Sequence, residues 1–150
     1  MSEANPYDEF IMDHIRNARN YRALSAASHH AAGINPLCGD EMTVYADIVQ
    51  ERIHDLGFQC SCCGISMASA SIMTDFLKSA TVADARPLLR TFLTAINSSA
   101  APLSHGLDGG RLAILQTVQA LPGRRKCAAL PWLTLEAALE GRAQAVSAGQ

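Results

Sequence analysis

The chain has 150 residues, of which 49% are hydrophobic and 17% charged, a composition that excludes intrinsic disorder. The formal net charge of −2 gives no reason to expect nucleic acid or an anionic membrane as a partner. The first residues lack the basic start and apolar core of an export signal, and the longest uncharged stretch, residues 56–74, contains four serines. We therefore expect one cytoplasmic domain over residues 1–150, with a core at about 7–140, frayed tails and no membrane segment.

The first half of the chain predicts one helix followed by a strand pair. Apolar residues at helical spacing indicate a helix over residues 7–24, and small, polar and glycine residues indicate a loop over 25–37. Alternating residues predict antiparallel strands over 42–50 and 52–59. The turn at residues 50–51 has no glycine, so the register of this pair stays open.

The second half predicts helices, at residues 64–79, 82–97, 111–120 and from Cys127 to about Glu140. Thr81 and Asp84 are expected to cap the second of these helices, and residues 98–110 read as a loop. Pro131 fits the last helix only if it lies in the first turn. A helix, then strands, then helices predict an α+β fold of two layers, in which a small antiparallel sheet packs against helices.

The cysteines carry the chemistry. There are five of them, and an odd number in a cytosolic chain argues against a disulfide framework and predicts reduced thiols: Cys38, Cys60, Cys62, Cys63 and Cys127.

A cysteine and a carboxylate lie two residues apart in Cys38-Gly39-Asp40, where the glycine gives the backbone the freedom to turn both toward one point. Cys63 lies between a predicted strand and a helix, and Cys127 starts a helix after a basic run. Three thiolates and one carboxylate suit tetrahedral zinc, or iron with sulfide. On spacing alone, a metal site and ordinary reduced cysteines are equal alternatives.

Three sequence blocks around these cysteines resemble the U-type iron–sulfur cluster assembly family, which includes SufU, IscU and the NifU N-terminal domain. Residues 35–41, NPLCGDE, resemble its NPxCGD motif, residues 63–74 its second cysteine block, and residues 126–132, KCAALPW, its third. The N-terminal segment with Ile11-Met12-Asp13-His14 resembles the family's first helix. The resemblance covers roughly residues 7–140 and implies a SufU/IscU-like α+β fold.

Within this family the chain resembles the SufU branch. Lys126 precedes the third cysteine, where IscU-like scaffolds have a histidine, and 63 residues separate Cys63 from Cys127, as in the longer SufU form. The chaperone-recognition LPPVK sequence of IscU-like proteins is replaced by LPGRRK at residues 121–126.

The resemblance implies a zinc-dependent sulfurtransferase that works with a SufS-type cysteine desulfurase and supplies downstream Suf scaffold proteins. Zinc would be held by Cys38, Asp40, Cys63 and Cys127, and Cys38 would leave the metal to accept persulfide sulfur. Arg124 matches a family arginine near the metal, where it would hold Asp40 or steady thiolate charge. The alternatives are a scaffold that assembles and transfers a [2Fe–2S] cluster, and a structural zinc domain.

One departure from the family concerns the residues before the second cysteine. The family usually has glycines there, whereas this chain reads Cys60-Ser61-Cys62-Cys63. Either the two extra thiols are tolerated drift, or they serve metal binding or sulfur relay, and Cys62 or Cys60 then becomes an alternative ligand to Cys63.

Three further features favour packing over chemistry. We expect the serines at positions 66, 69 and 71 to allow close helix packing, Trp132 to anchor the core or an interface, and His14 to be an interior or interface histidine.

Overall fold

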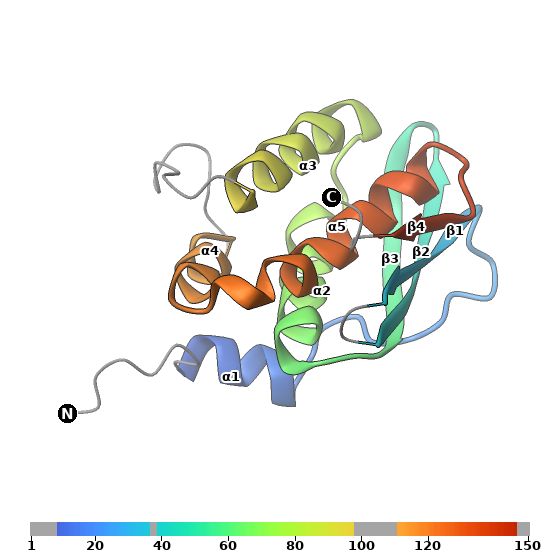
Figure 1. The fold of residues 1–150 in the computed structure, drawn as a ribbon. Helices are drawn as coiled ribbons and strands as arrows, with labels where there is room; N and C mark the ends of the chain where they lie inside the picture. Colours follow the sequence, from blue (N-terminus) through green and yellow to red (C-terminus); the bar gives the residue numbers. More distant parts are fainter. Residues whose placement is uncertain (1–8, 37–38, 98–110, 147–150) are drawn as a thin grey trace.

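The computed structural model describes residues 9–36, 39–97 and 111–146. Four strands form one sheet in the order β3-β2-β1-β4, and the helices gather on one side of it (Figure 1). The predicted α+β class is therefore confirmed. The elements are α1 (Glu9–Arg16), β1 (His29–Asn35), β2 (Asp40–Val49), β3 (Arg52–Ser61), α2 (Gly64–Leu77), α3 (Val82–Ile96), α4 (Arg111–Ala120), a 3-10 turn at Pro122–Arg124, α5 (Arg125–Leu139) and β4 (Gln144–Val146).

The sheet is mostly antiparallel. β2 pairs antiparallel with both β1 and β3, and β4 adds a short parallel edge beside β1. The turn from β2 to β3 uses Gln50 and Glu51 at φ of 53° and 63°, so two non-glycine residues adopt the left-handed region that this tight hairpin needs. The predicted strand pair is confirmed, and its register places Val49 opposite Arg52.

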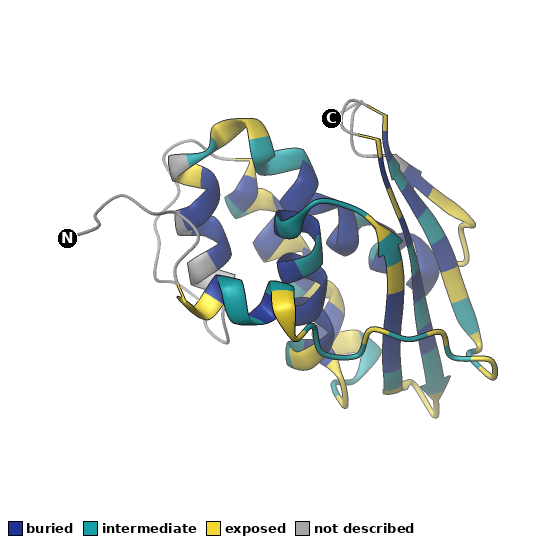
Figure 2. Cartoon of the chain, turned by 90° about the horizontal axis from the view of Figure 1, so that it is seen from below, coloured by how far each residue is buried: buried dark blue, intermediate teal, exposed yellow. Residues whose placement is uncertain are grey.

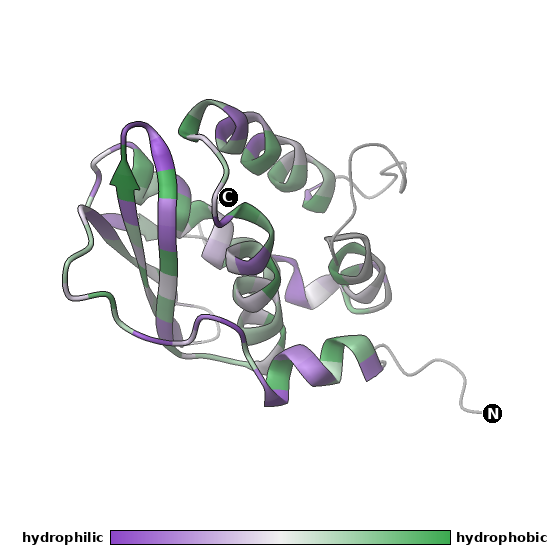
Figure 3. Ribbon diagram, turned by 180° about the vertical axis from the view of Figure 1, so that it is seen from behind, coloured by the Kyte–Doolittle hydropathy of each residue, from purple (hydrophilic) through white to green (hydrophobic). Residues whose placement is uncertain are grey.

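The core lies between the sheet and the helices. Figure 2 shows the buried residues concentrated on the facing sides of the two layers, and Figure 3 shows hydrophobic and hydrophilic residues alternating along the strands. α5 lies against β1 and β2, and α2 packs on α5. Trp132 of α5 is fully buried and stacks on Phe92 of α3 with ring centroids 4.2 Å apart, so its expected role as a core anchor is met. No helix in the described ranges is long and apolar enough to cross a membrane.

The helices α2, α3 and α4 match their predictions closely, and Thr81 Oγ1 accepts the expected capping hydrogen bond from the Asp84 N–H at 3.0 Å. The first helix does not match. Predicted over residues 7–24, it ends at Arg16, and Asn20 adopts a left-handed φ of 64°. The chain then runs along the edge of β3, where the Phe58 N–H donates to the Asn20 carbonyl at 3.1 Å. The helical pattern of residues 17–24 is therefore outweighed by hydrogen bonding to the edge of β3, whose backbone groups need partners.

Two strands were not predicted. Residues 29–35 lie in the predicted loop but form β1, and residues 144–146 lie in the predicted frayed tail but form β4. Both sequences are short of the β-branched and aromatic residues that signal strands. Their strand structure comes from their neighbours, because β2 supplies hydrogen bonds to β1, and β1 to β4. β1 also packs closely on α5, since a side chain at Gly33 would collide with Thr134.

Pro131 lies well inside α5, so the expectation that it occupies the first turn is wrong. Proline has no N–H to donate to the carbonyl four residues earlier, which is that of Cys127. The Ser66 hydroxyl of α2 lies 2.9 Å from this carbonyl and donates to it. The next carbonyl, that of Ala128, accepts from Ser69 Oγ at 2.7 Å. Ser66 and Ser69 therefore do more than permit close packing, because they bond the carbonyl groups near the proline.

Candidate metal centre

Three predicted ligands come together from three elements. Asp40 is the first residue of β2, Cys63 is the residue that precedes α2, and Cys127 lies in the first turn of α5. One carboxylate oxygen and the two sulfur atoms all lie within 4.8 Å of one another. Asp40 and Cys127 are buried and Cys63 is partly buried. The fourth predicted ligand, Cys38, lies outside the described residues, so the complete ligand set stays a prediction.

The turn that leads into Asp40 depends on glycine. Gly39 has a φ of +78°, a left-handed conformation that residues with a side chain rarely adopt, and its N–H donates to the Asn35 carbonyl at 2.8 Å. This turn reverses the chain from β1 into β2 and pairs Asp40 with Asn35 at the end of both strands. The backbone freedom expected of Gly39 is used here.

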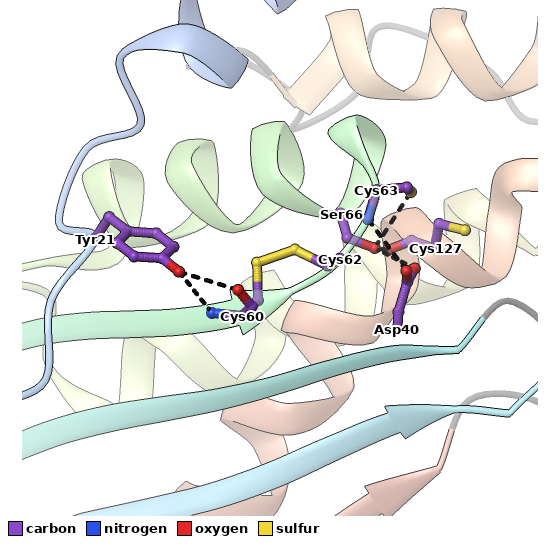
Figure 4. The surroundings of a disulfide bond; sticks show 7 residues. All are labelled: Tyr21, Asp40, Cys60, Cys62, Cys63, Ser66 and Cys127. Carbon is purple, nitrogen blue, oxygen red and sulfur yellow. Dashed lines mark hydrogen bonds between the residues drawn. A yellow bond between two sulfur atoms is a disulfide. The ribbon is translucent and has the colours of Figure 1, made fainter.

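The Asp40 carboxylate is fixed from the start of α2. Its Oδ1 accepts from the Cys63 N–H at 3.1 Å, and its Oδ2 lies 3.0 Å from Ser66 Oγ (Figure 4). The N-terminal end of a helix favours a negative charge, because its first N–H groups point outward. The single Ser66 proton serves either Asp40 or the Cys127 carbonyl at one time, so Ser66 links β2, α2 and α5.

The two thiols lie in surroundings that favour negative charge. A hydrogen bond with Cys127 lowers the pKa of Cys63 to about 6, and hydrogen bonds from Ser66 act in the same direction, whereas burial and the Asp40 charge oppose them. Cys127 Sγ accepts contacts of 3.9 Å from Asn35 Nδ2 and from Arg124 Nη1. The Arg124 guanidinium therefore lies beside a sulfur atom of the centre, and its expected roles toward Asp40 or thiolate charge stay predictions.

The donor atoms fit zinc. In a tetrahedral site with zinc–sulfur bonds of about 2.3 Å and zinc–oxygen bonds of about 2.1 Å, neighbouring ligand atoms lie roughly 3.5–3.8 Å apart. The three atoms, found within 4.8 Å of one another, need to approach by no more than about 1 Å to close around such an ion. Two soft sulfur atoms and one carboxylate leave a fourth position for another ligand.

Cys60 and Cys62 differ from the expectation of reduced thiols, because they form a disulfide with each other. Figure 4 shows this disulfide on the strand side of Cys63, with Asp40 and Cys127 on the other side. The backbone explains the arrangement: β3 ends at Ser61, so the chain bends between the two cysteines before α2 begins. Of the alternatives for the second-block ligand, Cys63 is the residue that the structure groups with Asp40 and Cys127.

Two residues that support this centre were not predicted to do so. Asn35 was noted only as part of the first cysteine block, yet it is fully buried and bonds Cys127 Sγ. Ser66 was interpreted as a small packing residue. Its place three residues after Cys63, where side chains commonly bond groups at a helix N-terminus, was the available signal.

Comparisons with known proteins agree with the motifs. The model of the NifU-like N-terminal domain family matches residues 6–128. The chain is 33% identical over 130 residues to the zinc-dependent sulfurtransferase SufU of Bacillus subtilis, which covers 87% of this chain and 86% of that protein. It is also 33% identical over 84 residues to the iron–sulfur cluster assembly scaffold protein IscU 1 of Archaeoglobus fulgidus, over 56% of this chain and 55% of that protein.

Comparison with solved structures finds proteins of the same kind. A crystal structure of an iron–sulfur cluster assembly scaffold protein for the SUF system from Fervidobacterium islandicum AW-1 superposes with a TM-score of 0.79 at 29% identity. The match covers 92% of this chain and 99% of that one. The three cysteine blocks, the fold and the family match lead to one conclusion: the chain belongs to the NifU-like N-terminal domain family of iron–sulfur cluster assembly proteins.

Proposed function

We propose that this chain is a zinc-dependent sulfurtransferase that takes persulfide sulfur from a SufS-type cysteine desulfurase and passes it on for iron–sulfur cluster assembly. The observation that carries the proposal is the convergence of Asp40, Cys63 and Cys127 within 4.8 Å. Cys38 completes the proposed ligand set and is the proposed sulfur acceptor. The relative named as a zinc-dependent sulfurtransferase, at 33% identity over most of both chains, supports the same choice.

The residues of the centre have different roles in the proposed transfer. When bound, zinc keeps its cysteine ligands deprotonated. Asp40 is the hardest ligand of the set and the easiest to exchange, and its hydrogen bonds to the Cys63 N–H and Ser66 keep it in position. The Arg124 guanidinium beside Cys127 Sγ offsets thiolate charge when one ligand leaves. Cys38 is then free to react while Cys63 and Cys127 stay in place.

The transfer step is a thiol exchange. The Cys38 thiolate attacks the terminal sulfur of the desulfurase persulfide, a new sulfur–sulfur bond forms at Cys38, and the desulfurase thiolate leaves. The step needs no outside oxidant or reductant, since the sulfane sulfur keeps its oxidation state. Downstream Suf scaffold proteins are the proposed next acceptors.

A scaffold for a [2Fe–2S] cluster is the second candidate, because the same donor set suits iron with sulfide and several relatives are named as IscU scaffolds. Two features favour the sulfurtransferase. Lys126 replaces the histidine that precedes the third cysteine in IscU-like proteins, and the long interval between Cys63 and Cys127 contains α3 and α4.

Metal analysis together with a desulfurase assay tests the proposal. We expect about one zinc per chain, no visible absorption, and stimulation of the desulfurase that Cys38→Ser abolishes. A brown protein with stoichiometric iron and sulfide would favour the scaffold. If Cys38→Ser stimulates normally while Cys62→Ser does not, the assignment of the acceptor is wrong.

A further inference from the structure

Next to the proposed centre lies a cysteine pair that the proposed function does not use. Cys60, near the end of β3, and Cys62, two residues later, are joined by a disulfide, and both are partly exposed. A partly exposed cysteine is more accessible to another thiol than a fully buried one. Cys62 is bonded directly to Cys63 along the chain, so the pair lies beside the sulfur chemistry already proposed.

The pair is held in place by contacts that do not involve its sulfur atoms. The Tyr21 hydroxyl donates to the Cys60 carbonyl at 3.0 Å and accepts from the Cys60 N–H at 3.2 Å. On the other side, the Cys63 N–H is bonded to Asp40. Breaking the disulfide removes neither anchor. The two thiols of the reduced form therefore stay close together and are ready to close again.

We propose that Cys60 and Cys62 are a two-electron dithiol–disulfide couple that reduces persulfide sulfur to sulfide. The inference rests on the proposed function only for the source of the persulfide. The disulfide in the structure is the oxidised product of this reaction, and the dithiol is the active form.

The reaction balances in two steps. First, the Cys62 thiolate attacks the terminal sulfur of a persulfide R–S–SH, the R–S bond to that sulfur breaks, RSH leaves, and Cys62 carries the extra sulfur. Second, the Cys60 thiolate attacks the Cys62 sulfur, the Cys60–Cys62 disulfide forms, and hydrosulfide leaves. Two thiols are oxidised to one disulfide, and one sulfane sulfur is reduced to sulfide. An external thiol then restores the dithiol.

Cys62 is assigned the first attack because it adjoins the centre at Cys63, and Cys60 the second because Tyr21 fixes its backbone. This order gives the two single variants different results. Cys60→Ser keeps the attacking thiol and loses the resolving one, so it should retain an extra sulfur atom on Cys62. Cys62→Ser should retain none at either position.

The test uses the full-length, zinc-loaded chain, reduced and then freed of reductant under anaerobic conditions, with glutathione persulfide as the probe. We expect about one sulfide per chain above the level of the Cys60→Ser/Cys62→Ser double variant, formed together with the disulfide. Peptide mass spectrometry locates the disulfide and the extra sulfur. Zinc content and melting temperature of the variants, which should equal those of the wild type, check that the fold is intact.

Equal sulfide from the wild type and the double variant would overturn the proposal. So would sulfide release without the Cys60–Cys62 disulfide, or a Cys60→Ser protein that carries no extra sulfur on Cys62. The probe bypasses the desulfurase, and any sulfur that Cys38 takes up is the same in the wild type and the double variant, so it cancels in the comparison. A negative result here therefore leaves the proposed sulfurtransferase untouched, and absent desulfurase stimulation leaves a positive result here untouched.

Discussion

Two pairs of cysteines meet at the junction between β3 and α2, and their surroundings differ. Cys60 and Cys62 are partly exposed, are joined to each other, and are fixed through backbone groups by Tyr21 at the sheet edge. Cys63 and Cys127 are not joined in a disulfide, and they are grouped with the buried Asp40 carboxylate. Cys62 and Cys63 are adjacent in sequence but lie in different environments, because the chain passes from the end of β3 to the start of α2 and successive side chains turn to different sides.

Position relative to the helix start, more than residue type, separates the proposed metal chemistry from the proposed redox chemistry in this segment. The centre has hydrogen-bond donors aimed at it from Asn35, Ser66 and Arg124. Such donors stabilise thiolates and a carboxylate, the forms that bind metal. Among the residues that the structure describes, no comparable set of donors bonds the sulfur atoms of Cys60 and Cys62, and the Tyr21 hydroxyl holds only the backbone of Cys60.

The largest expected contrast is between Cys63→Ser and Cys62→Ser. Losing Cys63 removes a strong soft ligand, and metal binding energy is also folding energy, so this variant should lose most of its zinc and melt at a clearly lower temperature. Cys62→Ser, one residue away, should keep both. Zinc quantification and thermal melting measure the contrast. Equal losses in the two variants would mean that the segment binds metal as a whole.

Asp40→Ala should separate metal retention from sulfur transfer. Three thiolates still hold zinc, so the metal content should stay near that of the wild type. Persulfide transfer should fall, because losing the carboxylate lowers the negative charge around the site, the thiolates bind the metal more tightly, and Cys38 leaves it less readily. The Cys63 N–H loses its acceptor, whereas the Ser66 hydroxyl still donates to the Cys127 carbonyl, so the unfolding free energy should fall by about 1–3 kcal/mol. Zinc analysis, denaturant unfolding and desulfurase-coupled sulfide release test this together. Full activity in Asp40→Ala would show that Asp40 is not a functional ligand.

Much of this centre was predictable, because its motifs are local. Asp40, Cys63 and Cys127 were chosen from the three cysteine blocks, and the structure groups them. The roles of Asn35 and Ser66 were not predictable from local sequence, since they depend on how β1, α2 and α5 meet. The Cys60–Cys62 disulfide was missed because the prediction used only the rule that cytosolic cysteines are usually reduced. That rule does not consider two thiols that a bend in the chain brings together.

In the fold, too, the features set by local sequence were predicted and those set by contacts between elements were missed. Helices with a continuous apolar face and a cap, such as α2 and α3, were predicted well. The strands β1 and β4 were missed because their pairing partners, and not their own residues, make them strands. Pro131 was misplaced because hydroxyl groups on another helix compensate for its missing hydrogen bond.

Ser66→Ala should weaken the centre and leave the Cys60–Cys62 pair unchanged. It removes the hydroxyl shared by Asp40 and the Cys127 carbonyl, and the buried acceptors left behind should lower the unfolding free energy by about 1–3 kcal/mol. The disulfide pair should be unaffected, so the yield of Cys60–Cys62 disulfide after mild oxidation should match that of the wild type. Urea unfolding and peptide mapping measure the two effects. A stability equal to that of the wild type would remove Ser66 from the support of the centre.

Tyr21→Phe is the matching change on the other side and should have the smallest effect. The hydroxyl bonds both backbone groups of Cys60 at an exposed edge, so its loss should cost about 0.5–1.5 kcal/mol and leave zinc content unchanged. Its readout is the rate at which the reduced pair closes again, which should fall. If Tyr21→Phe loses zinc instead, the two environments are coupled and the contrast between them fails.

Zinc K-edge X-ray absorption on the freshly purified chain and on the Cys60→Ser/Cys62→Ser double variant tests the central claim most directly. The claim is that zinc is bound by Cys38, Asp40, Cys63 and Cys127, independently of the neighbouring pair. We predict about three sulfur ligands and one oxygen ligand in both proteins, with the same spectrum. A site with four sulfur ligands in the wild type that loses sulfur in the double variant would contradict the account.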